Sequence, residues 1–376
     1  MAVPWLVTAA PAPQEQWLQY KTGEGYMGYA WIEPSTNPPP NLTLPKLNAT
    51  PYFARWVTPL DPSGGRWLCF DRTRKSGPYD RLYMDRNGNG RLDDEAPVSA
   101  TRRDDTSAHF DALRLVFKGE DGPVTYHLTL RFMKYEDGQV NVLAEPACWY
   151  QGVVNLGGKK VPIKLMDANV NGLFNDISVK CREGDSIQIG EEKEGSSNVR
   201  SLGRLLEVGG QYYALEVARD GAFVKIKKAE GLTFGQVRVP KSISELTAVG
   251  EAGEFKRQPT NGLFTLPAGA YSVRAWDINR KDNKGTVWTL SGSDYTGGIG
   301  FETGAAEPVA LEIGEPLRAA LQASESKATV AFSLRLQGRF GESVQIMRGR
   351  ARPRAPQLLL ASRNGSFRST NTFEYG

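Results

Sequence analysis

The chain has 376 residues, of which 40% are hydrophobic and 23% are charged, and its formal net charge is +4. This length accommodates two or three domains, and so mild a charge does not indicate a nucleic-acid-binding protein. No stretch of the sequence approaches the roughly 20 consecutive apolar residues of a membrane-spanning helix, and three cysteines are too few for a disulfide-stapled scaffold.

The N-terminal region, residues 1–50, is predicted to be extended. It begins with an apolar run that ends in small residues and lacks the basic leading region of a complete signal peptide. We expect this run to be the remnant of one, in a fragment or trimmed chain of a secreted or cell-envelope protein. Residues 34–45 are dense in Pro, Asn and Thr, which indicates an extended loop or linker.

Short strands are predicted from about residue 51 onward. Residues 52–57 and 66–70 are bulky and aromatic, whereas residues 109–117 and 124–132 alternate apolar and polar side chains. This alternation is typical of half-buried antiparallel strands, because successive side chains of a strand point to opposite faces of its sheet. An Asp-Gly pair separates the two alternating segments and predicts a β-hairpin.

A strand–turn–strand–loop unit occurs twice in this region. The first copy runs from residue 67 to a loop that begins at Asp85, and the second runs from residue 151 to a loop that begins at Asp167. In both copies a Met-Asp pair joins the second strand to the acidic loop. The economical interpretation is a duplicated hairpin-plus-loop unit within one sheet-rich domain.

Beyond residue 189 the sequence favours a linker followed by further β modules. One helical patch is predicted near 196–206, and a second hairpin is predicted at 211–227 around an Asp-Gly turn. A Pro-Ala-Gly turn joins two strands within 262–276, and residues 328–336 alternate strongly. The sequence therefore predicts an all-β, multi-domain protein of antiparallel β-sandwiches. Its predicted parts are the extended segment (1–50), the β-rich loop domain (51–192) and two β-sandwich modules (205–305 and 306–376).

The first acidic loop, from Asp85, has the oxygen spacing of the front half of a calcium loop. Oxygen-bearing side chains occupy positions one, three and five, and Gly90 permits the sharp turn at position six. Position twelve, where a bidentate glutamate is expected, is Ala96, although Asp94 and Glu95 just before it could serve. An Asn-Gly-rich hairpin turn with solvated charges is the alternative. The predicted calcium ligands are the side chains of Asp85, Asn87, Asn89, Asp93 and Glu95 and the carbonyl of Arg91.

The second loop, from Asp167, repeats this spacing, with Gly172 at position six and Ser178 at position twelve. Two carboxylates and three amides make a cage of low charge, so we expect weaker calcium affinity than in the first loop. Magnesium is less suitable, because it requires a small octahedral site and retains several waters. The predicted ligands are the side chains of Asp167, Asn169, Asn171 and Asp176 and the carbonyl of Leu173.

Other candidate sites are less specific. Residues 277–285 echo the loop pattern, but a lysine stands at position five, which favours a plain hairpin loop.

His109 and His127 are the only histidines, and they fit ordinary strand positions or a catalytic pair. Cys148 and Cys181 flank the second loop and could form a disulfide or remain buried thiols. No Gly-x-Ser-x-Gly motif, zinc-spaced His/Cys cluster or phosphate-binding glycine loop occurs in the sequence.

Basic and aromatic residues leave further alternatives open. Four arginines alternate between residues 348 and 354, and they could bind an anionic polymer or a membrane surface, or belong to a solvated loop. Exposed tryptophans could stack on sugars, although most of the eight are expected in the core. No spacing of carboxylates indicates a glycosidase pair.

The two acidic loops resemble the Asp-x-Asp-x-Asp-Gly calcium loops of dockerin and thrombospondin type 3 repeats. The resemblance covers about a dozen residues in each loop, with asparagines where those families often have aspartates. It implies bound calcium that rigidifies an extracellular protein. Residues 266–276 resemble the Pro-x-Gly-x-Tyr segment of immunoglobulin-like bacterial surface modules, including carboxypeptidase regulatory-like domains, which implies an immunoglobulin-like fold for the C-terminal modules.

Together these patterns predict a secreted or cell-envelope, calcium-stabilised structural or binding protein without catalytic activity. Two alternatives stay open, a carbohydrate-binding or glycan-active protein and an assembly subunit of an extracellular structure. An extracellular glycan or protein is the expected class of partner, and nucleic acid is not expected.

Overall fold

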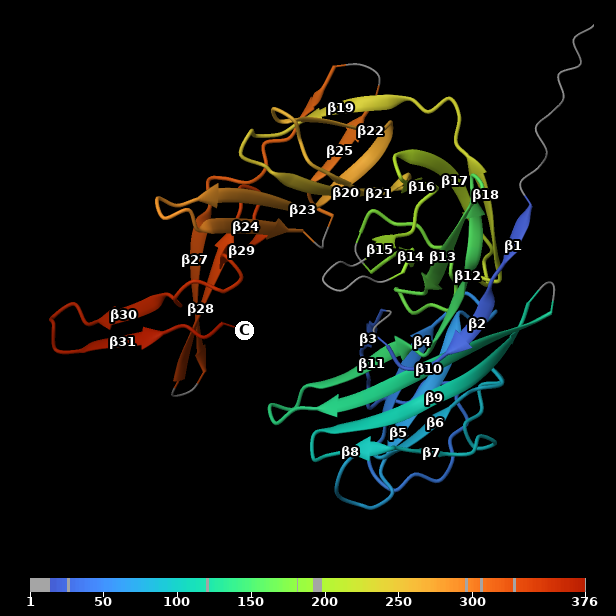
Figure 1. Ribbon diagram of the computed structural model, residues 1–376. Helices are drawn as coiled ribbons and strands as arrows, with labels where there is room; N and C mark the ends of the chain where they lie inside the picture. Colours follow the sequence, from blue (N-terminus) through green and yellow to red (C-terminus); the bar gives the residue numbers. More distant parts are fainter. Residues whose placement is uncertain are drawn as a thin grey trace, which may run out of the picture. The chain divides into compact units, whose positions relative to one another are not determined.

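The computed structural model describes residues 14–25, 28–119, 122–180, 182–191, 198–294, 297–304, 307–326 and 329–375 (Figure 1). These residues form strands, turns and irregular segments and no helix, so the predicted all-β class is confirmed. The helical patch predicted near 196–206 is wrong, because its described residues include two short strands, β15 (Val199–Ser201) and β16 (Leu205–Val208). Within the described ranges no helix could therefore cross a membrane.

The chain has two compact units. Unit 1 holds the described residues up to Ser178 and those of 182–229, and unit 2 holds residues 179–180 and the described residues from Glu230 onward. The boundary lies at residues 229–230 rather than at 205, because the strands of 205–228 pack into the core of unit 1.

Four antiparallel sheets build unit 1. The sheet before the first acidic loop has the spatial order β4 (Tyr52–Val57), β5 (Gly65–Asp71), β6 (Arg81–Met84) and β7 (Val98–Ser99). The next has the order β3 (Ala30–Ile32), β11 (Val140–Pro146), β10 (Pro123–Lys134), β9 (Ser107–Lys118) and β8 (Arg102–Arg103). The third has the order β2 (Gln19–Thr22), β12 (Cys148–Leu156), β13 (Lys159–Met166), β14 (Ser186–Ile189) and β15. The fourth has the order β1 (Glu15–Trp17), β18 (Phe223–Lys228), β17 (Gln211–Val217) and β16.

The predicted hairpins are present in these sheets. β9 pairs with β10, β17 pairs with β18, and the strands of the two predicted loop units pair as β5–β6 and β12–β13. The segment 1–50 is not merely extended, because β1, β2 and β3 lie within it and pair with β18, β12 and β11.

One hydrophobic core joins the four sheets of unit 1. Phe70 of β5, Tyr126 of β10, Leu165 of β13 and Val224 of β18 are all inaccessible to solvent and belong to the same cluster. Burying a side chain of this size contributes about 1.5–3 kcal/mol, so the shared core holds the sheets together in a β-sandwich-like arrangement. The alternation on β9 follows from it, since Leu113 and its same-face neighbours point inward.

A second, smaller cluster covers the outer face of β5. It contains the buried side chains of Phe53, Cys69, Tyr83 and Leu92, with partly buried leucines from residues 42–47 packed against them. Because both faces of β5 are covered, this strand is apolar at consecutive positions rather than alternating. Leu92 belongs to the first acidic loop, so the loop is part of this cluster.

Unit 2 contains one large and two small sheets. The large sheet has the order β21 (Gly253–Arg257), β20 (Glu245–Gly250), β23 (Gly269–Lys281), β24 (Val287–Ser293), β29 (Ser343–Arg348), β28 (Thr329–Gln337) and β27 (Arg318–Ser326), and β25 (Gly300–Thr303) also pairs with β23. The small sheets are β22 (Leu263–Pro267), β19 (Phe234–Arg238) and β26 (Val309–Ala310), and the hairpin of β30 (Gln357–Ala361) and β31 (Arg368–Thr372). The modules predicted to meet at 305/306 therefore share one sheet. The strands predicted around the Pro-Ala-Gly turn, β22 and β23, lie in different sheets.

The carboxylate of Asp80 connects two sheets of unit 1. Asp80 is 3% exposed, accepts hydrogen bonds from Thr73 N–H (2.8 Å) and Thr73 Oγ1 (2.9 Å), and pairs with Arg103 of β8. Burial by itself would raise the pKa of Asp80, but these hydrogen bonds and the Arg103 charge outweigh it and lower the pKa.

We predict that Asp80→Asn lowers the stability of the protein at pH 7 and that this loss disappears in acid. The folded-state pKa of Asp80 lies below the unfolded value of about 3.9, so the ionised carboxylate contributes its full stability above that value. The contribution is lost as the pH falls through the folded-state pKa. Urea denaturation of both proteins at a series of pH values measures the difference. Asp105→Asn is the control, because Asp105 is exposed and makes no hydrogen bond or ion pair within the described residues. A difference that stays constant with pH would contradict this role of Asp80.

Candidate functional site

The first acidic loop wraps around a buried carboxylate at the end of β6. Asp85 is 3% exposed. Its side chain accepts the main-chain N–H groups of Gly88 (2.8 Å), Asn89 (3.1 Å) and Gly90 (3.0 Å). Gly88 and Gly90 have positive φ angles of 75° and 73°, which glycine adopts without steric cost. The sequence therefore allows three successive N–H groups to turn toward Asp85.

The two asparagine side chains of this loop meet Asp94. Asn87 Nδ2 and Asn89 Nδ2 donate to Asp94 Oδ2 at 3.4 Å and 2.7 Å. Their Oδ1 atoms accept the N–H groups of Asn89 (3.0 Å) and Arg91 (2.9 Å). The hydrogen bond from Asn89 is the main cause of the lowered pKa of Asp94. The structure thus brings together Asn87, Asn89 and Asp94, the last of which was only a secondary candidate in the sequence.

The other two carboxylates predicted as ligands in the first loop have arginine partners. Asp93 pairs with the Arg91 guanidinium at 2.7 Å. Glu95 accepts the N–H of Arg86 at 2.7 Å and pairs with Arg86 Nε at 3.0 Å. In this structure both side chains therefore neutralise arginines of the same loop.

The second loop begins with the same set of hydrogen bonds. Asp167 is inaccessible to solvent, and its carboxylate accepts N–H groups from the fourth, fifth and sixth loop residues. These are Val170 (2.6 Å), Asn171 (3.2 Å) and Gly172 (2.6 Å), the positions that correspond to Gly88, Asn89 and Gly90.

The amide–carboxylate group of the second loop also matches that of the first. Asn169 Nδ2 and Asn171 Nδ2 donate to Asp176 Oδ2 at 3.0 Å and 2.7 Å, and Asn171 Oδ1 accepts the N–H of Leu173 at 2.8 Å. Asp176 is the tenth residue of its loop, as Asp94 is of the first. The equivalent hydrogen bonds show that both loops adopt the same local conformation.

An apolar residue at position eight anchors each loop. Leu92 is inaccessible to solvent and packs beside Tyr83 in the small cluster of unit 1. Phe174 is 2% exposed, belongs to the main core and makes an edge-on contact with the Tyr150 ring at 5.1 Å between centroids. These anchors hold the loops against the sheets.

The second loop is bound to β4 and β10 by two buried hydrogen bonds. Tyr126 of β10 donates its hydroxyl to Asp167 Oδ2 at 2.8 Å, and Trp56 of β4 donates Nε1–H to the Val170 carbonyl at 2.7 Å. Val170 has a φ angle of 60°, which a β-branched residue rarely adopts. Its burial and the Trp56 hydrogen bond hold the strained residue in place.

Asp185 completes the second site and was missed by the sequence analysis. It is 2% exposed, and its carboxylate accepts the N–H groups of Ala168 (3.2 Å) and Asp176 (2.8 Å). Glu95 has the equivalent role in the first loop, where it accepts the N–H of the second loop residue. Burial, followed by repulsion from Asp167, raises the pKa of Asp185 well above its usual range. Asp185 lies outside the twelve-residue loop pattern, so the spacing gave no signal for it.

Metal-binding geometry in these loops depends on more than acidic side chains. Among the described residues, no group of three or more His, Cys, Asp or Glu side chains is arranged to hold a metal ion. A cation in either loop would therefore need asparagine and main-chain oxygens among its ligands. In the weaker candidate at 277–285, residues 277–281 belong to β23, and the hairpin turn to β24 begins at Asp282, which accepts the N–H groups of Lys284 and Thr286.

The histidines and cysteines lie in ordinary strand environments. His109 is opposite Arg131 and His127 is opposite Arg114, so the two histidines are not cross-strand partners. Burial is the main cause of the lowered pKa of each histidine. Cys148 is a buried free thiol whose pKa is raised to about 11 by burial, and Cys181 lies outside the described residues.

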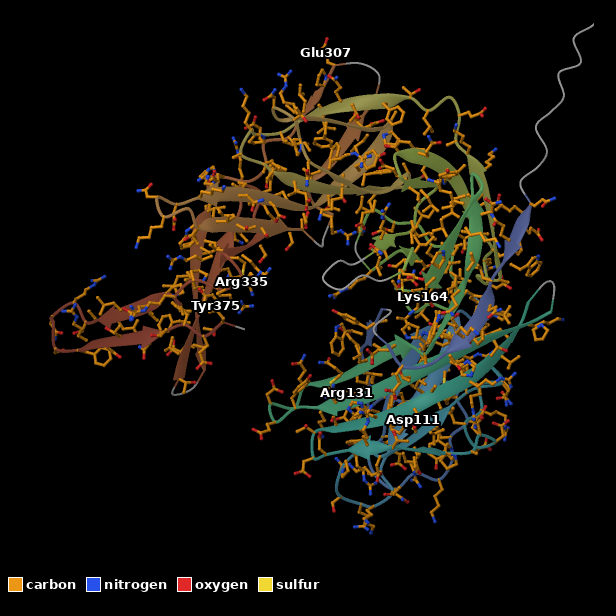
Figure 2. All side chains as sticks on the ribbon, in the orientation of Figure 1. Asp111, Arg131, Lys164, Glu307, Arg335 and Tyr375 are labelled. Atoms are coloured by element: carbon orange, nitrogen blue, oxygen red, sulfur yellow. The ribbon has the colours of Figure 1, made fainter. Side chains whose placement is uncertain are left out.

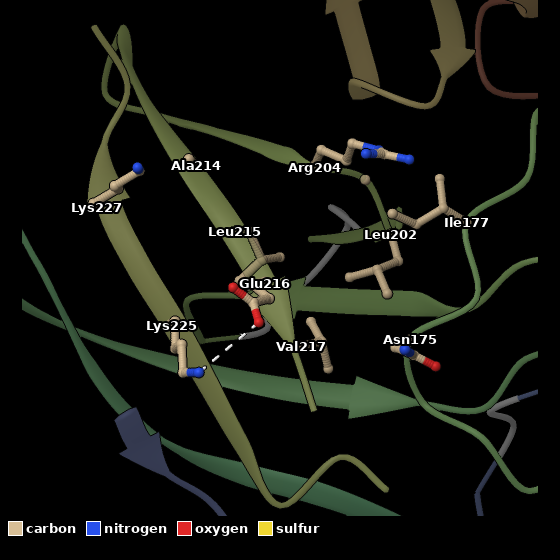
Figure 3. Close-up of a pocket in the computed structure, with 11 residues that line it drawn as sticks. Asn175, Ile177, Leu202, Arg204, Ala214, Leu215, Glu216, Val217, Lys225 and Lys227 are labelled. Carbon is tan, nitrogen blue, oxygen red and sulfur yellow. Dashed lines mark ion pairs between the residues drawn. The ribbon is translucent and has the colours of Figure 1, made fainter. Parts of the chain in front are cut away.

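A cavity of about 440 Å³ lies in unit 1 and is partly lined by Asn175 of the second loop (Figure 3). Leu202 and Leu215 supply apolar surface, whereas Glu216 and Lys225 form an ion pair at 3.9 Å beside it. Because charges of both signs border the cavity, its chemistry does not specify one class of ligand.

The arginine stretch of 348–354 lies beside strands of unit 2. Arg335 of β28 and Tyr375 line a cavity of about 590 Å³ together with Arg352 and Arg354 (Figure 2). Arg348 lies 5.7 Å from the ring centroid of Trp288. The stretch therefore borders folded parts of unit 2, and its binding of an anionic polymer stays a prediction.

The tryptophans divide between core and surface. Trp56 and Trp276 are 1% exposed, whereas Trp17 and Trp31 are 67% and 53% exposed. Trp17 contacts Phe223, but their ring planes are inclined by 55°. This pair does not form the flat platform that favours stacking on a sugar ring.

Comparisons with known proteins found no similar protein or structure. No protein-family model matches the chain, no curated protein matches its sequence, and no solved structure matches it.

The hydrogen bond from Tyr126 to Asp167 gives a testable prediction. Tyr126→Phe should destabilise the protein by about 1.5–3 kcal/mol, because a buried carboxylate loses one donor that solvent cannot replace. Urea denaturation in the presence of a chelator measures the change in the free energy of unfolding. Tyr135→Phe is the matched control, because Tyr135 is 43% exposed. Equal stabilities of the two variants would show that the buried hydrogen bond contributes little.

Proposed function

We propose that this chain is a calcium-stabilised structural or binding protein of the secreted or cell-envelope class, without catalytic activity. The observation that supports the proposal is the recurrence of one hydrogen-bonded loop at two places in unit 1. In both loops the first Asp, two Asn and the tenth-position Asp have equivalent partners. We interpret the two loops as copies of one duplicated unit whose polar side chains are retained for a common ligand.

Calcium is the ligand that suits this set of groups. It takes six to eight oxygen ligands in flexible geometry, and carboxylate, amide and main-chain oxygens all serve. The first loop offers the side chains of Asp85, Asn87, Asn89 and Asp94 with the Arg91 carbonyl. The second offers those of Asp167, Asn169, Asn171 and Asp176 with the Leu173 carbonyl.

The hydrogen bonds of the loops indicate how a cation would act. The Asn Nδ2 groups donate to Asp94 and Asp176, which supplies partial positive charge to these carboxylates. A calcium ion in the same region would supply full positive charge and would draw the amide oxygens toward it. The ion would then hold the loop closed against the core through the anchors Leu92 and Phe174.

The expected role of calcium is to stabilise unit 1. At a calcium concentration a hundredfold above the dissociation constant of one site, the gain is about 2.7 kcal/mol. For a unit of this size that gain corresponds to a rise in melting temperature of about 5–10 °C. We predict this rise when calcium is added to chelator-treated protein, with differential scanning calorimetry as the measurement.

Isosteric substitutions separate the two loops. Asp94→Asn and Asp176→Asn keep the side-chain size and should each remove calcium binding from one loop, and the double variant should remove it from both. Isothermal titration calorimetry counts the sites directly. Asp137→Asn serves as the matched control, because Asp137 is an exposed residue of the β10–β11 turn. A wild-type protein without binding heat and without a calcium-dependent melting temperature would sink the proposal.

A further inference from the structure

A cationic pocket lies in unit 1, and no residue of the acidic loops lines it. Its volume is about 580 Å³, and Arg72, Lys75, Lys134, Tyr52 and Tyr79 line it together with residues 48–50. The three cations come from two places in the fold. Arg72 and Lys75 follow β5, whereas Lys134 is the last residue of β10.

All the charged side chains that line this pocket are cationic. No carboxylate lines it, and within the described residues its three cationic side chains form no ion pair. The nearby carboxylate of Asp71 is inaccessible to solvent and is already occupied. It accepts the N–H groups of Asn48 (3.1 Å) and Ala49 (3.2 Å) and pairs with Arg81. Converging cations repel one another, and a bound anion would relieve that repulsion.

The guanidinium of Arg72 is oriented for an oxyanion. Its central carbon lies 4.2 Å from the centroid of the Tyr79 ring, and the Tyr79 hydroxyl is fixed by a 3.1 Å hydrogen bond to the Thr50 carbonyl. Arg72 Nε is buried, so its Nη groups, which have no hydrogen-bond acceptor among the described residues, are the donors open to a ligand. A guanidinium held by its face presents its N–H groups in its own plane, which suits two oxygens of one anion.

The other pocket residues favour an ester rather than a free ion. Lys134 Nζ lies 5.6 Å and 5.7 Å from the ring centroids of Tyr52 and Tyr79. A volume of this size fits a small molecule, since ligand sites usually occupy about 300–1,000 Å³. Asn48 Nδ2 already donates to the Arg72 and Thr73 carbonyls, so Asn48 Oδ1 and Thr50 Oγ1 are the polar atoms left for hydroxyls. The half-buried Tyr52 ring provides a flat face.

We propose that this pocket binds the phosphate or sulfate ester of a small sugar. Arg72 and Lys134 hold the oxyanion, Lys75 closes its open side, and the sugar contacts Tyr52 and the segment of residues 48–50. The proposal does not depend on calcium in the loops, because none of the pocket residues belongs to them.

Isothermal titration calorimetry of the full chain at low ionic strength tests the proposal. The probes are glucose-6-phosphate, glucose-6-sulfate, glucose and inorganic phosphate. We expect at least one of the esters to bind, glucose not to bind, and the affinity of the ester to fall as salt is added. Binding of inorganic phosphate alone would overturn the assignment of a sugar ester, and no binding heat with any probe would overturn the site.

Substitutions locate the binding. Arg72→Gln, Lys75→Gln and Lys134→Gln should each weaken ester binding at least about tenfold, because each removes a charged donor. Lys118→Gln is the matched control, since Lys118 is an exposed residue at the end of β9 outside the pocket. Lys75 is exposed, so its substitution leaves the core intact and keeps the test valid if another variant fails to fold. Ester affinities of the pocket variants equal to that of Lys118→Gln would overturn the proposal.

Discussion

The buried carboxylate of Asp167 must find every hydrogen-bond donor inside the protein, because solvent does not reach it. Three donors are main-chain N–H groups of its own loop, which fixes the loop conformation, and the fourth is the hydroxyl of Tyr126 from β10. The position of the second loop therefore depends on a strand from another sheet. The conformation of the second loop and the packing of the unit 1 core therefore depend on each other, because Tyr126 contributes to both.

In both loops a further carboxylate accepts the N–H of the second loop residue, but that carboxylate has different surroundings. In the first, Glu95 comes from within the loop and is paired with Arg86, whereas in the second, Asp185 comes from outside the loop and is buried beside Asp167. Counting Asp185, each loop has three carboxylates that accept hydrogen bonds from its main chain or amides. The first loop has Asp93 in addition, and its carboxylates at Asp94 and Glu95 are more exposed than those of Asp176 and Asp185, respectively, in the second.

The sequence predicted the features that local periodicity and turn chemistry determine. The hairpin of β9 and β10 follows from alternating apolar and polar residues about an Asp-Gly pair, although the pairing register shifts between Leu128 and Leu130. The loop starts at Asp85 and Asp167 follow from the spacing of oxygen-bearing residues. Among the three consecutive acids, the spacing favoured Asp93 and Glu95 as ligands, whereas Asp94 is the one that accepts hydrogen bonds from the asparagines. Spacing alone does not reveal which of three consecutive acids turns toward those side chains.

Features that depend on distant parts of the chain were not predictable from the same patterns. β1 and β2 have only three and four residues, and each pairs with a strand more than a hundred residues away. The predicted boundary at residue 205 failed for a related reason, since alternation identifies β17 and β18 as strands but does not identify the core that they join. Asp185 was missed because its partners are brought to it by the fold.

The hydrogen bond of Trp56 to the Val170 carbonyl has a spectroscopic consequence. The indole of Trp56 is shielded from solvent, stacks on Tyr126 with 5.4 Å between ring centroids, and has its N–H directed at the second loop. Indole emission is sensitive to the electric field and the hydrogen bonding at its nitrogen. A rearrangement of the loop main chain would therefore change the wavelength and the intensity of the fluorescence of Trp56. Trp56 is thus an intrinsic fluorophore in direct contact with the second loop.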